Sequence, residues 1–260
     1  MKNDRNVDAR CLELLRESDA IENITNINYE LPRNRQLKKG HYGAFQESQR
    51  LAREYQPLNL EELCRWQGMI TSDQLKYGHE IPLNAVAHLR SPNLPINVRV
   101  GEHVAPVFSE VPALMETFVA DLNQQLATMK SSPNIVGIVS VLGDFFQRFE
   151  AIHPFVDGNG RTGRLLLNYI ATWCKCPLIV VRLKDRPTFY PAHRSKKAMR
   201  LFMGEKIQEV AVNREGDLLP LVKQYEFSAL YQDPAIPGQL IIEWHELIQA
   251  MDAWKSEIPN

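Results

Sequence analysis

Apolar residues along this chain recur mainly at the spacing of an amphipathic helix. Between positions 6 and 22, Leu12, Leu15 and Ile21 fall on or near one helical face. Pro57 ends a second helical pattern, and Asn59 is a typical start for a third. Helices are therefore predicted over residues 6–22, 44–54, 59–70, 111–130, 134–152 and 165–174, and over about 30 to 50 residues after Lys196.

The segment from 80 to 112 departs from this helical period. Prolines interrupt it at positions 82, 92, 95, 106 and 112, and the short runs 85–90 and 96–101 between them have β-type composition. This combination predicts one small, exposed hairpin bounded by loops. The expected fold class is therefore mostly α, a helical bundle with one short β-hairpin.

The two ends of the chain are predicted to be separate elements. Residues 1–40 hold the first helix, expected at about 8–23, and a polar connection over 24–40. A core is expected over 41–225, with its hairpin near 86–103. The tail 226–260 predicts a helix with an apolar face, which either packs on the core or forms a homodimer surface.

Composition and charge narrow the function classes. The formal net charge is −1, so no overall field attracts nucleic acid or an anionic membrane. The basic cluster Arg194, Lys196, Lys197 and Arg200 lacks interleaved aromatic residues, which favours a solvated helix face over a nucleic-acid site. The N-terminus lacks the apolar region of a secretion signal, and the cysteine spacing predicts reduced thiols, so we expect a cytoplasmic protein.

The stretch HPFVDGNGRTGR, from His153 to Arg164, concentrates the candidate chemistry. Two glycines around Asn159 permit an irregular backbone, and the pattern turns helical directly after them. Such a loop opens onto a helix N-terminus, whose free N–H groups bind anions. Arg161 and Arg164 are three residues apart on the first turn, so both can face one phosphate group.

Two further side chains complete a site for phosphoryl or nucleotidyl transfer. Asp157 supplies a carboxylate beside the predicted phosphate site, which is typical of a magnesium ligand. His153 is the group in this stretch that can accept a proton near neutral pH. A phosphate cradle, a metal ligand and a base are the parts that such a reaction requires.

This stretch resembles the Fic family motif, H-P-F-x-D/E-G-N-G-R-x-x-R, with every fixed position present. The resemblance covers residues from about 10 to 225 and implies a mostly helical fold with a hairpin, the flap, over the active site. It also implies adenylyl transfer (AMPylation): a hydroxyl of a target protein attacks the α-phosphate of ATP, and pyrophosphate leaves. The implied cofactors are ATP and Mg²⁺, and the implied partner is a target protein docked at the flap.

The family roles carry over to matching positions of this chain. His153 resembles the general base, Asp157 the magnesium ligand and Phe155 the core anchor of the loop. Tyr190, and after it Phe189, resemble residues that contact the adenine base or the ribose. The alternative for this aromatic pair is packing in the core. An asparagine found in some relatives is replaced by Lys197, so that contact is not expected. The remaining nucleotide-site residues implied are the motif residues Gly158, Asn159, Gly160, Arg161, Thr162, Gly163 and Arg164, and the flap residues Val100, Gly101, Glu102 and His103.

A second short stretch, SDAIEN from Ser18 to Asn23, resembles the inhibitory motif of this family, S/T-x-x-x-E-G/N. Its place upstream of the core is that of the N-terminally inhibited class, class II. The resemblance implies that Glu22 pairs with Arg164 and takes the guanidinium that the γ-phosphate needs. The alternative is an ordinary helix end, with Glu22 exposed and Asn23 as its cap.

Three other functions stay open at the level of sequence. The same scaffold could transfer UMP, phosphate or phosphocholine, because the contacts to the base lie outside the motif. It could also remove AMP from a target. A non-catalytic nucleotide-binding regulatory module is a third class, although such a protein would not need His153 and Asp157.

Overall fold

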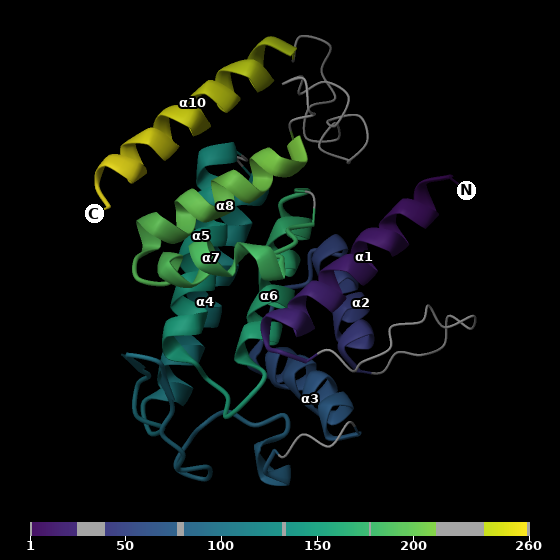
Figure 1. Cartoon of the computed structure of the whole chain (residues 1–260), viewed down its shortest axis with the longest axis vertical. Helices are drawn as coiled ribbons and strands as arrows, with labels where there is room; N and C mark the ends of the chain where they lie inside the picture. Colours follow the sequence, from purple (N-terminus) through teal and green to yellow (C-terminus); the bar gives the residue numbers. More distant parts are fainter. Residues whose placement is uncertain are drawn as a thin grey trace.

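The computed structural model describes residues 2–24, 40–76, 81–131, 134–176, 178–211 and 237–258. Helices make up most of these residues, and the hairpin is the small sheet among them (Figure 1). The predicted fold class is therefore confirmed. In chain order the elements are α1 (Lys2–Ile21), α2 (Gly40–Arg53), α3 (Leu60–Lys76), η1 (Leu83–Ala85), β1 (Arg99–Val100), β2 (His103–Val104), α4 (Val111–Ser131), α5 (Ile135–Ile152), α6 (Asn159–Trp173), η2 (Leu183–Asp185), α7 (Arg186–Ala192), α8 (Lys196–Ala211) and α10 (Pro237–Ser256).

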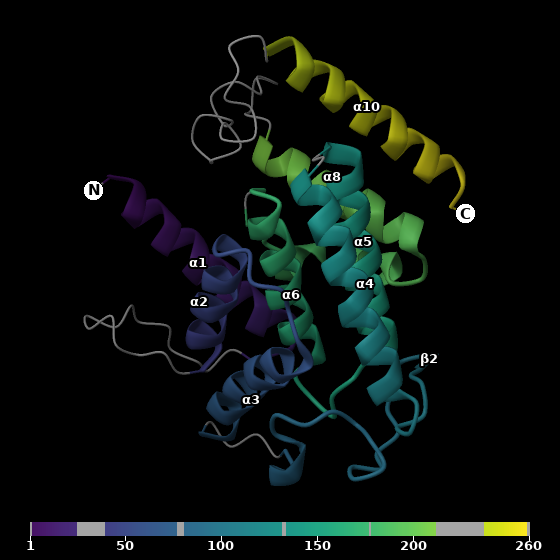
Figure 2. The same ribbon diagram turned by 180° about the vertical axis from the view of Figure 1, so that it is seen from behind.

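Helices α5 and α6 form the centre of the bundle. Both are rich in buried apolar side chains, and every residue of α6 from Arg161 to Ile170 is buried. Helices α4 and α8 pack against α5, whereas α2 and α3 pack against α6 (Figures 1 and 2). The loop that joins α5 to α6 is thus held between two packed layers, which fixes its position.

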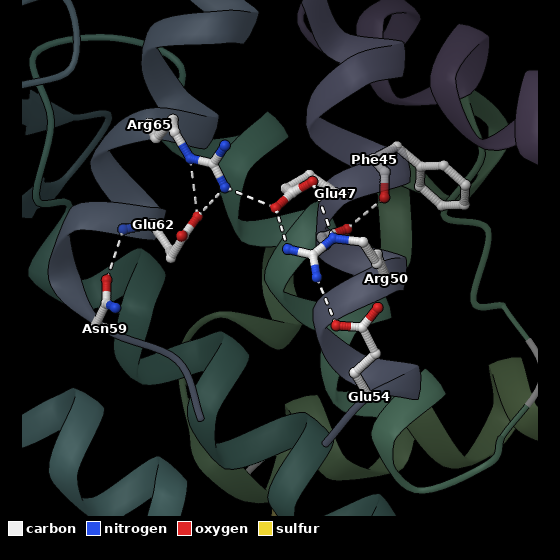
Figure 3. Close-up of polar contacts among 8 residues, drawn as sticks. Phe45, Glu47, Arg50, Glu54, Asn59, Glu62 and Arg65 are labelled. Atoms are coloured by element: carbon white, nitrogen blue, oxygen red, sulfur yellow. Dashed lines mark hydrogen bonds and ion pairs between the residues drawn. The ribbon is translucent and has the colours of Figure 1, made fainter. Parts of the chain in front are cut away.

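A network of charged side chains joins α2 to α3 (Figure 3). Glu47 accepts hydrogen bonds from Arg50 at 2.6 Å and from Arg65 of α3 at 2.9 Å, and these bonds lower its pKa to about 2. Asn59 caps α3 by accepting a hydrogen bond from the Glu62 N–H at 2.8 Å. The network fixes α3, whose Gln67 reaches the α5–α6 loop.

The hairpin is smaller than the sequence predicts. Its strands pair Arg99 with Val104 and Val100 with His103, so the pairing spans two residues in each strand. The run 85–90, predicted as a strand, is irregular, and this prediction is wrong. Ala87 has a left-handed φ of 61° and its N–H donates to the Gln67 side chain, so the backbone turns away there from an extended conformation.

The other element boundaries differ from prediction by a few residues. Helix α1 begins earlier than the expected position 8, and α6 begins at Asn159 instead of 165, because the glycine loop leads directly into the helix. Part of the predicted connection, and the predicted boundary at 225, lie outside the described residues. No helix in the described part of the chain has the length and apolarity needed to cross a membrane.

The C-terminal helix packs on the core. Leu247, Met251 and Trp254 of α10 are buried, and α10 contacts α8 and α5. Met251 lies against Gly204 of α8, where a Cβ atom would come within 2.7 Å of its sulfur. Of the two alternatives left open by the sequence, core packing therefore holds for the described side chains of this tail, from 246 to 258.

Candidate active site

The loop between α5 and α6 begins with an unusual backbone conformation at His153. Helix α5 ends at Ile152, and His153 is left-handed, with φ 49° and ψ 62°, while its N–H still donates to the Phe149 carbonyl at 2.9 Å. A residue other than glycine pays a steric cost in this region, so the surrounding contacts must hold it there. Phe155 is fully buried against Phe149 and anchors the loop in the core, as its position in the motif predicts.

The second half of the loop leads into the N-terminus of α6, where the sequence predicts a backbone nest for phosphate. Asn159 closes the loop by accepting a hydrogen bond from the Phe155 N–H at 2.8 Å and donating one to the Phe155 carbonyl at 2.9 Å. Gly158 has a φ of 79°, which favours glycine, and it caps the N-terminus of α6. The N–H groups of the first turn of α6 therefore point out of the helix beside a glycine, at the positive end of the helix dipole.

Asp157 is placed at the edge of this nest. Its Oδ1 accepts a hydrogen bond from the Gly158 N–H at 2.6 Å, and its side chain is 43% exposed. Gln67 of α3 fixes the same turn by donating to the Asp157 carbonyl at 3.1 Å. Mg²⁺ is usually held by one or two carboxylates together with substrate phosphates, so an exposed carboxylate beside an anion nest fits that ion.

The two arginines of the motif point in different directions. Arg161 is 1% exposed and is directed back toward the loop, with Nη2 3.9 Å from Asp157 Oδ1. Arg164 is directed toward α1, where Nε donates to Ser18 Oγ and Nη2 donates to the Ser18 carbonyl, each at 2.8 Å. Both were expected to face one phosphate. In this conformation α1 holds the guanidinium of Arg164, and the joint binding of a phosphate by both arginines stays a prediction.

Glu22 also contacts Arg164. Its Oε1 lies 2.7 Å from Arg164 Nη2. The same oxygen lies over Gly160, where a Cβ atom would come within 2.2 Å of it. The carboxylate therefore lies against the first turn of α6, in space that exists because residue 160 has no side chain.

Other contacts hold the end of α1 in this place. Asn23 has a left-handed φ of 59° and closes the helix, as its cap position predicts. Arg186 of α7 donates to the Ile21 carbonyl and, at 2.9 Å, to the Asn23 side chain. In the middle of α1, Glu13 pairs with Arg182 at 2.8 Å. Helix α1 is thus docked through several side chains besides Glu22.

His153 carries a neutral imidazole at neutral pH. Burial lowers its pKa to about 4, and the positive charges of Arg90 and His103 act in the same direction. A hydrogen bond with the Glu150 backbone and the charge of Glu22 oppose this shift. The ring is therefore unprotonated across the whole neutral range, which leaves a ring nitrogen free to accept a proton.

The other residues named from the sequence differ in exposure. The side chain of Thr162 is fully buried and Gly163 lies against side chains of α5, and the contact of these two residues with the nucleotide stays a prediction. Phe189 is 2% exposed and packs between Phe146 and Phe202, so for this residue the alternative of core packing holds. Tyr190 is 49% exposed, and its hydroxyl points at the Ile21 carbonyl 3.4 Å away.

The flap residues Val100, Gly101, Glu102 and His103 form the exposed hairpin. Gly101 has a φ of 57° and makes the turn. The His103 ring does not point outward, because its Nε2 donates to the Ala151 carbonyl at 2.8 Å and so ties the hairpin to the end of α5.

Sequence reasoning missed Glu150, which lies one helical turn before His153. Its Oε1 is buried without a hydrogen-bond partner, above Gly163. Burial raises the pKa of Glu150 to about 8; Arg164 opposes this shift and Glu22 adds to it. The spacing of three residues before the histidine was the available signal.

We expect Glu150→Gln to stabilise the protein at pH 8 and not at pH 5. A carboxyl whose folded pKa is raised destabilises the fold increasingly as the pH rises from its unfolded pKa near 4.5 toward 8. The amide resembles the protonated carboxyl and removes this dependence. The melting temperature should rise by about 3 °C at pH 8 and by less than about 1 °C at pH 5. The exposed Glu54→Gln is the control, and an equal change at both pH values would contradict the assignment.

Comparisons with known proteins agree with this geometry. Residues 57–171 match the model of the Fic/DOC family. A protein adenylyltransferase Fic of Nematostella vectensis is 34% identical over 113 residues, which cover 44% of this chain and 24% of that protein. One of Drosophila melanogaster is 28% identical over 146 residues, 56% of this chain and 24% of that protein. The chain thus matches about a quarter of the length of these relatives.

Solved structures share the fold over more of the chain. A Fic domain containing signaling protein from Bacteroides thetaiotaomicron superposes with a TM-score of 0.58 at 22% identity, covering 99% of this chain and 92% of that one. A fragment of Fic-1 from C. elegans superposes with a TM-score of 0.57 at 15% identity, covering 85% of this chain and 65% of that one. At these identities the likeness establishes the helical fold.

Proposed function

Since this chain carries a Fic/DOC family domain over residues 57–171, we propose that it is a protein adenylyltransferase that transfers AMP from ATP to a hydroxyl group of a target protein, and that Glu22 inhibits it. The observation that carries this proposal is the loop between α5 and α6. It combines a neutral histidine, an anion nest and two arginines within twelve residues. The relatives that match about half of this chain are named protein adenylyltransferases, which supports the same reaction.

In the proposed reaction His153 accepts the proton of the attacking hydroxyl. The hydroxyl oxygen forms a bond to the α-phosphorus of ATP, the bond from that phosphorus to the α–β bridging oxygen breaks, and pyrophosphate leaves. The first turn of α6 and the residues Gly158 to Gly160 bind the phosphates through backbone N–H groups. Mg²⁺ bound at Asp157 would neutralise charge on the phosphates and on the leaving group.

The proposed inhibition follows from the contacts of Glu22. Its carboxylate holds Arg164 at 2.7 Å and lies over Gly160, where a phosphate oxygen would approach the helix N-terminus. Like charges disfavour each other in such a confined space, so the γ-phosphate of ATP cannot pair with Arg164 while Glu22 is bound. ATP bound in another position would present a misaligned α-phosphate, and a displacement of about 1 Å costs on the order of 100-fold in rate.

The hairpin is the proposed docking place for the target protein. Val100 and Val104 are exposed on its two strands, and a two-stranded sheet leaves the outer edge of each strand open. An extended segment of the target can add to such an edge through main-chain hydrogen bonds. The hairpin also lies next to the end of α5, through the bond of His103 to Ala151, so a docked segment would be close to His153.

A donor panel tests the reaction type. We expect Glu22→Gly, incubated with Mg²⁺, to become labelled, or to label proteins in a lysate, with ATP that carries the label on its α-phosphate. ATP labelled on the γ-phosphate should give no label, α-labelled UTP should give at most about a tenth of the label, and chelation of Mg²⁺ should abolish labelling. Label from the γ-phosphate would instead indicate a kinase. If the nucleotides bind without any transfer, the chain is a nucleotide-binding module.

A further inference from the structure

Arg90 is a buried cation that lies outside the α5–α6 loop. It is fully buried, and within the described part of the chain its guanidinium donates to backbone carbonyl oxygens alone. Burial lowers the pKa of this guanidinium from its ordinary value, which reflects the cost of removing a cation from water without a carboxylate at its side. The hydrogen bonds that Arg90 makes must therefore offset the free-energy cost of burying its guanidinium.

Two of these contacts cap the end of α5. Nε donates to the His153 carbonyl and Nη2 donates to the Ile152 carbonyl, each at 2.9 Å. The last carbonyls of a helix have no partner within the helix, and a cation is favoured at this negative end of the helix dipole. The backbone N–H of Arg90 adds a third bond to the same loop, to the Pro154 carbonyl at 2.9 Å.

The other two contacts hold the base of the hairpin. Nη1 donates to the Pro106 carbonyl at 2.9 Å and to the Ile96 carbonyl at 3.3 Å. Ile96 and Pro106 flank the hairpin on its two sides, since the strands run from Arg99 to Val104. One planar guanidinium thus joins both sides of the hairpin to the backbone of the left-handed His153.

We propose that Arg90 is a positioning residue that fixes the backbone of His153 and the base of the hairpin as one unit, so that the proposed base and the proposed docking edge keep a constant geometry. This inference rests on the proposed function for its effect on transfer. The geometric part, a coupling between two backbone segments, holds whatever reaction the site performs.

The phosphate site has its own supports, which makes the proposal specific. The Asn159 side chain binds both the N–H and the carbonyl of Phe155, and the Gln67 side chain donates to the Asp157 carbonyl. Loss of Arg90 should therefore leave the anion nest in place and displace His153 and the hairpin. This predicts a lower maximal rate of transfer and an almost unchanged ATP concentration for half of the maximal rate.

The test compares Arg90→Gln and Arg90→Lys in the Glu22→Gly chain, with Arg148→Gln as the matched control. Arg148 lies on α5 and pairs with Asp121 of α4 at 2.6 Å, so its loss removes one interhelical contact away from the loop. Self-labelling with α-labelled ATP gives the maximal rate and the ATP concentration for half of it. Amide hydrogen exchange of segments 96–108 and 152–157 reports the two backbones without any activity, and thermal melts show that each variant is folded.

We expect Arg90→Gln to lower the maximal rate about 100-fold, to change the half-saturating ATP concentration less than about 3-fold, and to raise exchange about 10-fold in both segments. Arg90→Lys keeps the charge but cannot reach both segments, so its rate should fall about 10-fold. It should also leave the pH profile unchanged, whereas Arg90→Gln shifts the acid limb to higher pH, because the charge that lowers the pKa of His153 is lost. Of the other charges that act on this ring, His103 stays in both variants and Glu22 is absent from both.

The exchange data separate the two proposals. If Glu22→Gly transfers no label, the proposed function fails, and the coupling stands or falls on hydrogen exchange alone. Exchange that rises in neither segment, or in one only, overturns the role of Arg90 whatever the activity. So does a rate within about twofold of the parent in a Glu22→Gly chain that does label.

Discussion

Replacing His153 by alanine in the Glu22→Gly chain is expected to lower AMP transfer by about 100- to 10,000-fold, the usual contribution of a general base. The reason is the state of the imidazole. Its pKa of about 4 keeps it neutral at neutral pH, so a ring nitrogen is free to accept the proton of the attacking hydroxyl. ATP binding should change little, because the anion nest lies on the other side of the loop and is held by Asn159.

The pH dependence of the parent provides a second readout of the same group. A histidine with an ordinary pKa of 6.5 would be about one-quarter neutral at pH 6, so transfer would be about fourfold slower there than at pH 7.5. The lowered pKa keeps the base neutral at both values, and loss of Glu22, whose charge raises this pKa, acts in the same direction. Rates at pH 6 and 7.5 should therefore agree within about twofold.

The exposed His88 offers a matched control. It lies in the segment before the hairpin, with its ring against the Val86 carbonyl, and has no place in the proposed mechanism. His88→Ala should transfer AMP at the rate of the parent, measured as incorporation of α-phosphate label over time. Equal rates in the His153→Ala and parent chains would exclude His153 as the base and leave the loop as a binding site.

The motif could be recognised from sequence because its parts are local. The loop conformation depends on Gly158 and Asn159, which bond to residues within four positions of themselves. The helices on either side follow from runs of apolar residues that the bundle buries. The position of each boundary was less certain, because the N-terminus of α6 is set by the capping of the loop and not by apolar spacing.

The residues that support the loop could not be read in the same way. Arg90 and Gln67 lie 60 to 90 positions away from their partners and bond to backbone atoms, so no residue type at the other end identifies the contact. The sequence also did not indicate which side chains point into the core and which point to the surface. Phe189 and Tyr190 are neighbours with similar composition signals, yet a short helix turns one into the core and the other to the surface.

The resemblance of the sequence to the inhibitory motif predicted the docking of α1 only in part. The SDAIEN stretch indicated the contact of Glu22 with Arg164. It did not indicate that Arg186 and Arg182 hold the same helix. The end of α1 therefore contacts Arg164 of the motif and also Arg186, which lies against the ring of Tyr190.

The second large effect is expected from Glu22→Gly, which should raise AMP transfer about 100-fold over the unchanged chain. Removing the carboxylate frees Arg164 Nη2 for a phosphate oxygen and clears the space over Gly160. The variant should stay folded with α1 in place, because Arg186 still binds the end of α1 and Glu13 still pairs with Arg182. The effect is measured as the initial rate of α-phosphate incorporation at equal protein concentration.

Glu17→Gln distinguishes loss of this specific contact from a general loosening of α1. Glu17 lies on the same helix and accepts a hydrogen bond from the Leu183 N–H at 2.7 Å, so its replacement weakens docking without freeing Arg164. We expect its rate to stay within about threefold of the unchanged chain. A similar rise in both variants would mean that docking of α1 as a whole, and not the pairing of Glu22 with Arg164, restrains the enzyme. Equal rates in Glu22→Gly and the unchanged chain would remove Glu22 from the regulation of this site, because the freed guanidinium would then have no effect on the position of ATP.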